Sequence, residues 1–309
     1  MANPVRKFIT VFGAANTDLV GFPDAGLVFS DSNKGKIKML PGGVGRNIAE
    51  NLSRLGQKVS LISVLGEDIF KDFLLKEARE SGIDMSESIV LEGESSAVFS
   101  AVLNRNNDLA VAIADMKIYD QLSPDIFYGD FPSMNKADYV VLETNFPANV
   151  LDYLVNRYPD KKFILDTVSG DKAKRSEPVL SQLFVLKTNL LEAEVITGIS
   201  AKTSDYRPMV EFFLEEGVEN VFITLGKEGV IYGNREKIHY LPPVPSKVVN
   251  TIGAGDAFLS GITFGFIQGF DLDRIARTGL ITAGLTVQTE EVVSPFITPE
   301  IVLDKLFDN

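Results

Sequence analysis

Apolar residues along the chain gather in short runs that end in glycine or polar residues, and segments with helical spacing separate these runs. The runs 8–12 and 59–66 are rich in β-branched and aromatic residues, which is typical of buried strands. The segment 41–56 carries apolar residues at helical spacing and ends in glycine, and 68–81 has a similar apolar face. The N-terminal part therefore predicts strands that alternate with helices.

The same alternation continues from residue 137 to residue 224. It predicts strands at 139–142, 163–165, 184–187 and 221–224, and helices at 148–158, 179–183, 190–197 and 206–216. Short strands that alternate with helices are typical of a parallel sheet with helices on both faces. The predicted fold class is therefore α/β, a three-layer α/β/α sandwich around a mostly parallel central sheet.

Two alternating stretches, 97–104 and 109–114, are separated by Arg105-Asn106-Asn107-Asp108, which is a β-hairpin signal. Residues 20–40 also resemble short exposed strands. We expect these parts, about 20–40 and 95–118, to form a small antiparallel β lid. The predicted organisation is a single domain over 1–309 from which this lid projects.

Composition narrows the function classes. A net charge of -12 argues against a nucleic-acid partner, because nucleic-acid binding needs a basic surface. The chain has no cysteine, which excludes thiol chemistry, and its one histidine, His239, is expected to be structural. Its uncharged apolar runs are shorter than a membrane span, so we expect no membrane partner and a cytoplasmic protein.

Polar residues follow several predicted strands at the same end. These groups are Asn16 to Asp18, Glu143 to Asn145, Lys187 to Glu192 and Thr224 to Gly229. Because parallel strands present ligand groups at their carboxyl ends, we expect all four groups at one edge of the sheet. Asn and Asp also cap turns without binding any ligand, so the pattern alone leaves both interpretations open.

Gly253-Ala254-Gly255-Asp256 opens an uncharged segment of helical spacing, Ala257 to Phe270. A helix N-terminus attracts anions, and glycine lets a phosphate approach the backbone. A carboxylate there would repel phosphate unless it had another task, such as accepting a proton from an attacking hydroxyl. The local pattern fits a plain helix cap equally well.

A second glycine-rich segment, Gly42-Gly43-Val44-Gly45-Arg46-Asn47, opens the helix predicted within 41–56. Paired glycines let a ligand lie against the backbone, and the neutral amide of Asn47 suits sugar hydroxyls. The alternative is that these glycines serve only close helix packing.

Together, the two segments resemble the signatures of the ribokinase-like (PfkB) family of carbohydrate and nucleoside kinases. The family has a Gly-Gly region that leads to Asn and a later Asp-Thr-x-Gly-Ala-Gly-Asp, which correspond here to 42–47 and 250–256. The match runs from the first strand to the final helices. It implies a ribokinase-like sandwich with a β lid, and ATP and Mg2+ as cofactors.

The resemblance also implies roles for individual residues. Asp256 would be the general base, and the anion hole for the transferred phosphoryl group would be formed by Gly253, Ala254 and Gly255. The residues at the sugar hydroxyls would be Asn16, Asp18, Gly42, Gly43 and Asn47. Asn189 and Glu192 would order phosphate and Mg2+ through water, and the nucleotide-binding turn would contain Thr224, Gly226 and Gly229.

Asn250 stands where the family usually has Asp, at a position that helps to organise a monovalent-cation site. Asparagine keeps an oxygen ligand but removes a charge. A K+ site at Asn250 therefore remains an expectation, while strong activation by K+ is in doubt.

Within the family, the segments 42–52 and 114–120, together with Asn250, most resemble pseudouridine kinases. A nucleobase would rest against Met116, or against Tyr119 and Phe99, although each side chain could equally be ordinary packing. The predicted function is ATP-dependent phosphorylation of the 5′-hydroxyl of a ribosyl substrate, pseudouridine first.

Other readings stay open beside this one. They are a kinase for another ribonucleoside or sugar, and a catalytically idle, ligand-sensing relative. A dinucleotide-binding oxidoreductase is disfavoured, because no Gly-x-Gly-x-x-Gly follows the first strand. A lid sheet with open edges could pair with a second copy, so a homodimer through the lid is compatible with the sequence, as is a monomer.

Overall fold

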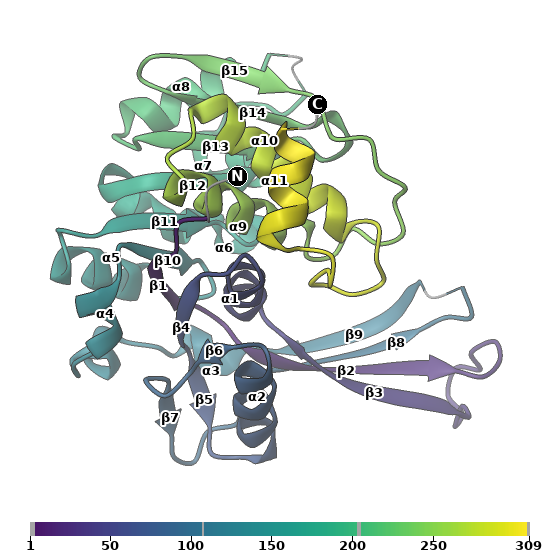
Figure 1. Cartoon of the computed structure of the whole chain (residues 1–309). Helices are drawn as coiled ribbons and strands as arrows, with labels where there is room; N and C mark the ends of the chain where they lie inside the picture. Colours follow the sequence, from purple (N-terminus) through teal and green to yellow (C-terminus); the bar gives the residue numbers. More distant parts are fainter. Residues whose placement is uncertain (1–3, 107, 203–204, 308–309) are drawn as a thin grey trace.

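A computed structural model describes residues 4–106, 108–202 and 205–307. Within these residues the main body is built on a nine-stranded sheet (Figure 1). In spatial order its strands are β15 (Ile238–Leu241), β14 (Val230–Asn234), β13 (Asn220–Thr224), β12 (Leu183–Asn189), β11 (Lys162–Asp166), β10 (Tyr139–Glu143), β1 (Phe8–Phe12), β4 (Lys58–Ile62) and β6 (Ile83–Asp84).

The sheet is parallel from β6 to β13, and only β14 and β15 add antiparallel pairs at one edge. Parallel pairing requires crossover connections, and here helices supply most of them. The helices of the main body are α1 (Val44–Arg54), α2 (Ile69–Glu80), α3 (Lys117–Asp120), α4 (Pro132–Lys136), α5 (Ala148–Arg157), α6 (Gly170–Ala173), α7 (Leu190–Thr197), α8 (Arg207–Glu215), α9 (Ala254–Ile267), α10 (Leu272–Thr286) and α11 (Pro299–Phe307).

Two hydrophobic cores lie on the opposite faces of the sheet. Alternate residues of β10 show this division, because Val140 packs in the core that contains α5 and Val141 packs in the core that contains α1 and α9. Successive side chains of a strand point to opposite faces, so a strand covered by helices on both sides is apolar throughout. The predicted three-layer α/β/α class is confirmed.

A second, small sheet has the order β3-β2-β8-β9 and extends away from the main body (Figure 1). Its strands are β2 (Asn16–Pro23), β3 (Gly35–Gly42), β8 (Val98–Leu103) and β9 (Leu109–Asp115). The pairs β2–β3 and β8–β9 are antiparallel, as predicted, while the central pair β2–β8 is parallel. Asn107 of the predicted hairpin turn lies outside the described residues.

One strand prediction is wrong in its extent. The apolar run 59–66 was expected to be continuous, but β4 ends at Ile62 and a separate strand, β5 (Val64–Gly66), pairs with β7 (Ile89–Leu91). The break lies at Ser63, whose N–H donates to the hydroxyl of Ser88 instead of to a sheet partner.

In the part of the chain that the structure describes, no helix has the length and apolar character that spanning a membrane requires.

Candidate active site

Helix α9 begins at the glycine-rich segment, and Gly253 is the residue that makes this possible. Gly253 has φ 79°, and a Cβ there would lie 2.1 Å from the carbonyl oxygen of Val292. Within the described residues, no side chain caps the first turn. The N–H of Ala254 donates to the carbonyl of Thr251 at 3.3 Å, and the N–H groups of Gly255 and Asp256 remain available to an anion. The helix therefore starts as the glycines predict.

Asp256 lies in this first turn and its carboxylate faces α1. The side-chain amide of Asn47 donates to Asp256 Oδ2 at 2.9 Å, across 209 residues of sequence. Both side chains are buried. Asp256 is therefore held toward the other glycine-rich segment, which the plain helix-cap interpretation does not require.

The environment of Asp256 favours its protonated form. Burial is the main cause that raises its pKa to about 7, and the nearby charges of Asp166 and Glu143 add to the effect. The hydrogen bond from Asn47 and the charge of Lys187 act in the opposite direction. A carboxylate that titrates near neutral pH can accept a proton efficiently.

The expected sugar-binding residues meet at the junction of the two sheets. Asn16 Nδ2 donates to Asp18 Oδ1 at 2.5 Å, and a Cβ on Gly42 would lie 2.6 Å from Asp18 Oδ2. Burial raises the pKa of Asp18 to about 6. Gly43, at φ 101°, directly precedes α1, and a Cβ there would lie 2.4 Å from the carbonyl oxygen of Ala14.

Both interpretations of the glycines in 42–45 are therefore compatible with the structure. Gly45 packs so closely against Gly13 that a Cβ on Gly45 would lie 2.7 Å from the Gly13 backbone. Close packing alone therefore requires glycine at position 45. Gly42 differs, since its constraint comes from the Asp18 carboxylate rather than from backbone.

The three side chains expected near a nucleobase have different environments. Tyr119 is fully buried, and its hydroxyl accepts from the N–H of Ala15 and donates to the carbonyl of Ala15, both at 2.8 Å. It therefore supports the segment after β1 from inside the core. Met116, next to α3, is only partly buried, and Phe99 lies beside Asp18 in the β2–β8 register.

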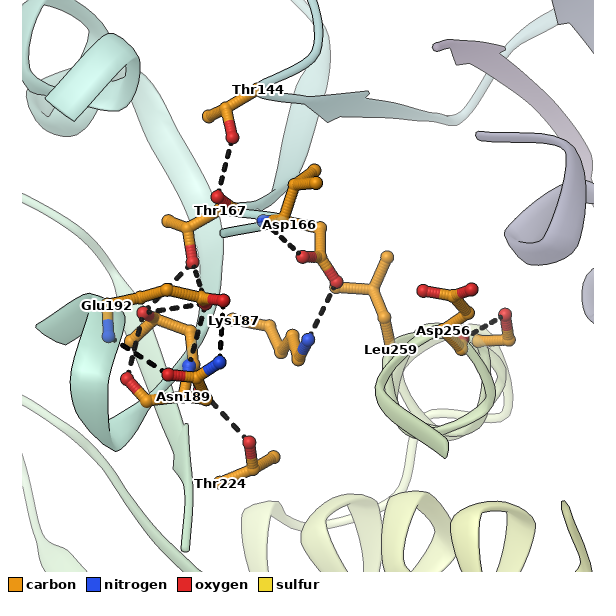
Figure 2. A network of polar contacts seen from close by, with 12 residues as sticks. Thr144, Asp166, Thr167, Lys187, Asn189, Glu192, Thr224, Asp256 and Leu259 are labelled. Atoms are coloured by element: carbon orange, nitrogen blue, oxygen red, sulfur yellow. Dashed lines mark hydrogen bonds and ion pairs between the residues drawn. The ribbon is translucent and has the colours of Figure 1, made fainter. Parts of the chain in front are cut away.

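The expected phosphate and magnesium residues form a connected network at the end of β12 (Figure 2). Asn189 and Glu192 make a reciprocal capping box at the start of α7. Glu192 also accepts from the hydroxyl of Thr167 at 2.5 Å. Because both carboxylate oxygens already have protein partners, Glu192 suits contact with a metal through water better than direct coordination.

The residues of the expected nucleotide turn lie next to this network. Thr224 donates to the carbonyl of Thr188 at 3.3 Å, which ties β13 to β12. Gly226 and Gly229 have φ values of 58° and 104°, which favour glycine. A Cβ on Gly229 would also lie 2.1 Å from the carbonyl oxygen of Leu241.

A buried ion pair at the centre of the site was not predicted from the sequence. Lys187 Nζ lies 2.8 Å from Asp166 Oδ2, and its side chain extends toward the start of α9 (Figure 2). A Cβ on Gly255 would lie 2.9 Å from Lys187 Nζ. Burial opposes the charge of Lys187, but Asp166, Glu192 and Asp256 together raise its pKa above the ordinary value. A cation thus lies beside the open N–H groups of the helix.

Glu143 is a second buried carboxylate to which the sequence assigned no role. It accepts from the N–H of Ala14 at 2.5 Å and from the N–H of Asn145 at 2.7 Å. Burial is the main cause that raises its pKa to about 7. The only signal for Lys187 and Glu143 was their place at strand ends.

Asn250 is hydrogen bonded through both ends of its side-chain amide. Its Oδ1 accepts from the N–H of Ile252 at 3.0 Å, and its Nδ2 donates to the carbonyl of Glu290 at 3.2 Å. The amide thus links the segment before α9 to the segment after α10, and its oxygen already has a donor. Across the described residues, no cluster of three or more acidic or histidine side chains could hold a metal ion.

Comparison with known proteins agrees with this arrangement. The model of the pfkB family of carbohydrate kinases matches residues 6–299, so the chain belongs to that family. A pseudouridine kinase of Escherichia coli is 29% identical over 294 residues, which cover 94% of this chain and 93% of the relative. The chain is an ATP-dependent carbohydrate or nucleoside kinase.

Solved structures show the same fold. A carbohydrate kinase from Agrobacterium tumefaciens superposes with a TM-score of 0.86 at 27% identity, covering 97% of each chain. A ribokinase from Arabidopsis thaliana complexed with ribose and ATP superposes with a TM-score of 0.83 at 21% identity, covering 99% of each chain. The ribokinase-like form of the sandwich is thereby confirmed.

Proposed function

We propose that this kinase transfers the γ-phosphoryl group of ATP to the 5′-hydroxyl of a ribosyl substrate, and that the substrate is pseudouridine. The observation that carries the proposal is the Asn47–Asp256 hydrogen bond, which joins the sugar-side and phosphate-side glycine segments. A base within reach of both an acceptor hydroxyl and an anion site is what phosphoryl transfer needs.

In this proposal, Asp256 accepts the proton of the 5′-hydroxyl as the oxygen attacks the γ-phosphorus. The N–H groups of Gly253, Ala254 and Gly255 stabilise the charge on the phosphoryl oxygens, and Lys187 adds a positive charge beside Gly255. As the new oxygen–phosphorus bond forms, the bond between the γ-phosphorus and the oxygen bridging it to the β-phosphorus breaks, and ADP leaves with that oxygen beside the turn that contains Gly226. Both the proton and the phosphoryl group are then accounted for.

The acceptor would be held by Asn16, Asp18, Gly42, Gly43 and Asn47. The Asp18 carboxylate is oriented by Asn16 and has room only because residue 42 is glycine. Carboxylate and amide groups pair well with vicinal sugar hydroxyls. Phe99 near the start of β8 and Met116 directly after β9 are the side chains that we assign to the base.

Magnesium would bind with the ATP phosphates, and Asn189 and Glu192 would orient it through water, consistent with the protein donors that both carboxylate oxygens of Glu192 already have. For a monovalent cation the fit is poor. The side chain of Asn250 is uncharged, and one lone pair of its oxygen already accepts from Ile252, so we propose that K+ has little effect on turnover.

The small sheet would act as a lid that excludes water from the phosphoryl group. Its strands β3 and β9 also expose apolar side chains, among them Ile37 and Ile113. Exposed edges with apolar side chains favour pairing, so we propose a homodimer formed through the lid. Sedimentation of the wild type and of Ile113→Lys tests this, since the substitution should yield monomers.

A substrate panel tests the proposed function. Purified protein, ATP and Mg2+ are combined with pseudouridine, uridine, inosine, adenosine or ribose, and ADP release is measured. Pseudouridine should give the highest kcat/KM. A much higher value with another acceptor would replace pseudouridine by that substrate, and ATP binding without ADP release for any acceptor would favour a ligand-sensing relative.

A further inference from the structure

Arg46 is a buried arginine that immediately precedes Asn47 on α1 and is only 6% exposed. Its Nη2 pairs with Glu50 one turn further along the helix. Its Nη1 donates to the carbonyl of Pro41 and to Asn47 Oδ1, both at 3.3 Å. Burying a guanidinium is costly. The ion pair with Glu50 offsets this cost, and the guanidinium also donates to Asn47. The position of Arg46 therefore indicates a role besides packing.

The chemistry of the guanidinium fixes the orientation of the Asn47 amide. Arginine has only donors, so the Asn47 atom that faces Arg46 is the carbonyl oxygen. The amide nitrogen then points the other way, and it donates to Asp256 Oδ2. Asp256 alone does not fix this orientation, because its protonated carboxyl group could donate to the oxygen of a reversed Asn47 amide.

We infer that Arg46 is a positioning residue for the reaction, because it holds the N–H end of Asn47 toward the Asp256 carboxylate. This inference rests on the proposed role of Asp256 as the base. The series of contacts runs from Glu50 to Arg46, then to Asn47, and ends at Asp256.

The charges around Asp256 show why the orientation matters. Asp166 from β11 and Glu143 from β10 repel a negative charge on Asp256, while Lys187 from β12 favours it. The Asn47 N–H is the hydrogen bond that favours the ionised form. A reversed amide would present its oxygen to the carboxylate and add a repulsive dipole, so less of Asp256 would be ionised at neutral pH.

Arg54 provides a matched control. It bonds the other oxygen of the same carboxylate, with Nη2 2.8 Å from Glu50 Oε1. It lies seven residues beyond Asn47, which is about 10 Å along the helix axis. Substitution of Arg54 therefore disturbs Glu50 and the charge of α1 without removing the donor to Asn47.

The test is the pH dependence of kcat/KM for the full chain with ATP, Mg2+ and the best acceptor. In Arg46→Met the acid limb of the pH profile of kcat/KM should shift to higher pH by about one unit. Relative to the wild type, kcat/KM should therefore fall about tenfold more at pH 6 than at pH 9. Arg54→Met should leave the limb in place. Arg46→Lys, which keeps a donor, should restore part of the shift.

A double-mutant cycle with Asn47→Ala separates this role from a general effect. If Arg46 acts through Asn47, adding Arg46→Met to Asn47→Ala moves the limb no further. The inference is overturned if Arg46→Met leaves the limb unmoved, or if its shift is the same in both backgrounds. Should Arg46→Met fail to fold, Arg46→Met with Glu50→Met removes both charges and is subject to the same criteria.

Failure of the proposed function would look different. It would appear in the wild type as absence of ADP release, or in Asp256→Asn as undiminished turnover, and neither result involves an Arg46 variant.

Discussion

The Lys187 ammonium forms a buried ion pair with Asp166 at 2.8 Å, and the same nitrogen lies beside Gly255 at the start of α9. Asp166 and Lys187 are register partners on the neighbouring parallel strands β11 and β12. A positive group next to the positive end of a helix is unfavourable unless anions are close. Here the carboxylates of Asp166 and Asp256 are the resident anions, and an incoming phosphoryl group would be another.

Replacing Lys187 by Met should therefore lower kcat by about 10² or more, as loss of a group that stabilises charge in the transition state does. It should also destabilise the fold by about 3–5 kcal/mol, because Asp166 would be buried without its partner. Steady-state kinetics and urea unfolding measure the two effects. Lys172→Met is the control, since Lys172 bonds Asn145 at the same sheet edge. Unchanged kcat in Lys187→Met would exclude this role.

Gly42→Ala should impair the acceptor site selectively. The added Cβ would lie 2.6 Å from Asp18 Oδ2, so the carboxylate must move. We expect KM for the acceptor to rise by about tenfold, the cost of a small misplacement, while KM for ATP changes little. Gly26→Ala is the matched control, because a Cβ there meets no atom within 4 Å. An equal KM for the acceptor in Gly42→Ala and Gly26→Ala would argue against Asp18 as a sugar ligand.

Activity and stability should respond to pH in opposite directions around Asp256. As a base it must be ionised, so kcat/KM should rise as pH increases through about 7. Its folded pKa is raised from 3.8, so its contribution to stability is full below about 4 and is lost as pH rises to about 7. Urea unfolding at pH 5 and pH 8 should show this loss, and Asp256→Asn should show less of it. An equal loss in the variant would indicate another group, such as Glu143.

Removal of K+ should leave turnover nearly unchanged. The oxygen of Asn250 already accepts from Ile252, and its amide links to Glu290. Activity in K+ is compared with activity in a large organic cation at the same ionic strength. Asn250→Asp should increase the dependence on K+, since a carboxylate attracts a cation more strongly. Marked activation of the wild type by K+ would contradict this prediction.

Much of the fold could be predicted because its signals are local. The strand 8–12 and the helix predicted at 68–81 depend on residues adjacent in sequence, and the structure has β1 and α2 where the pattern indicates. The break at Ser63 could not be predicted in the same way. It depends on Ser88 and Tyr119, which reach Ser63 only after the chain folds.

The candidate site likewise contains residues that the local sequence identifies and residues whose contacts form only in the folded chain. The glycine-rich segments identified Asp256 and Asn47, and the structure brings these two side chains together. The Lys187–Asp166 pair depends on the order of β11 and β12 in the sheet, which no local pattern specifies. Arg46 was visible in the motif, but its contact with Asn47 depends on the side-chain geometry of α1.

The measurement that tests the central claim most directly is the turnover of Asp256→Asn. Asparagine keeps the size of the side chain but cannot accept the proton, so kcat should fall by about 10²–10⁴ while ATP binding, measured by calorimetry, is retained. Turnover close to that of the wild type, in a variant that binds ATP normally, would show that Asp256 is not the base.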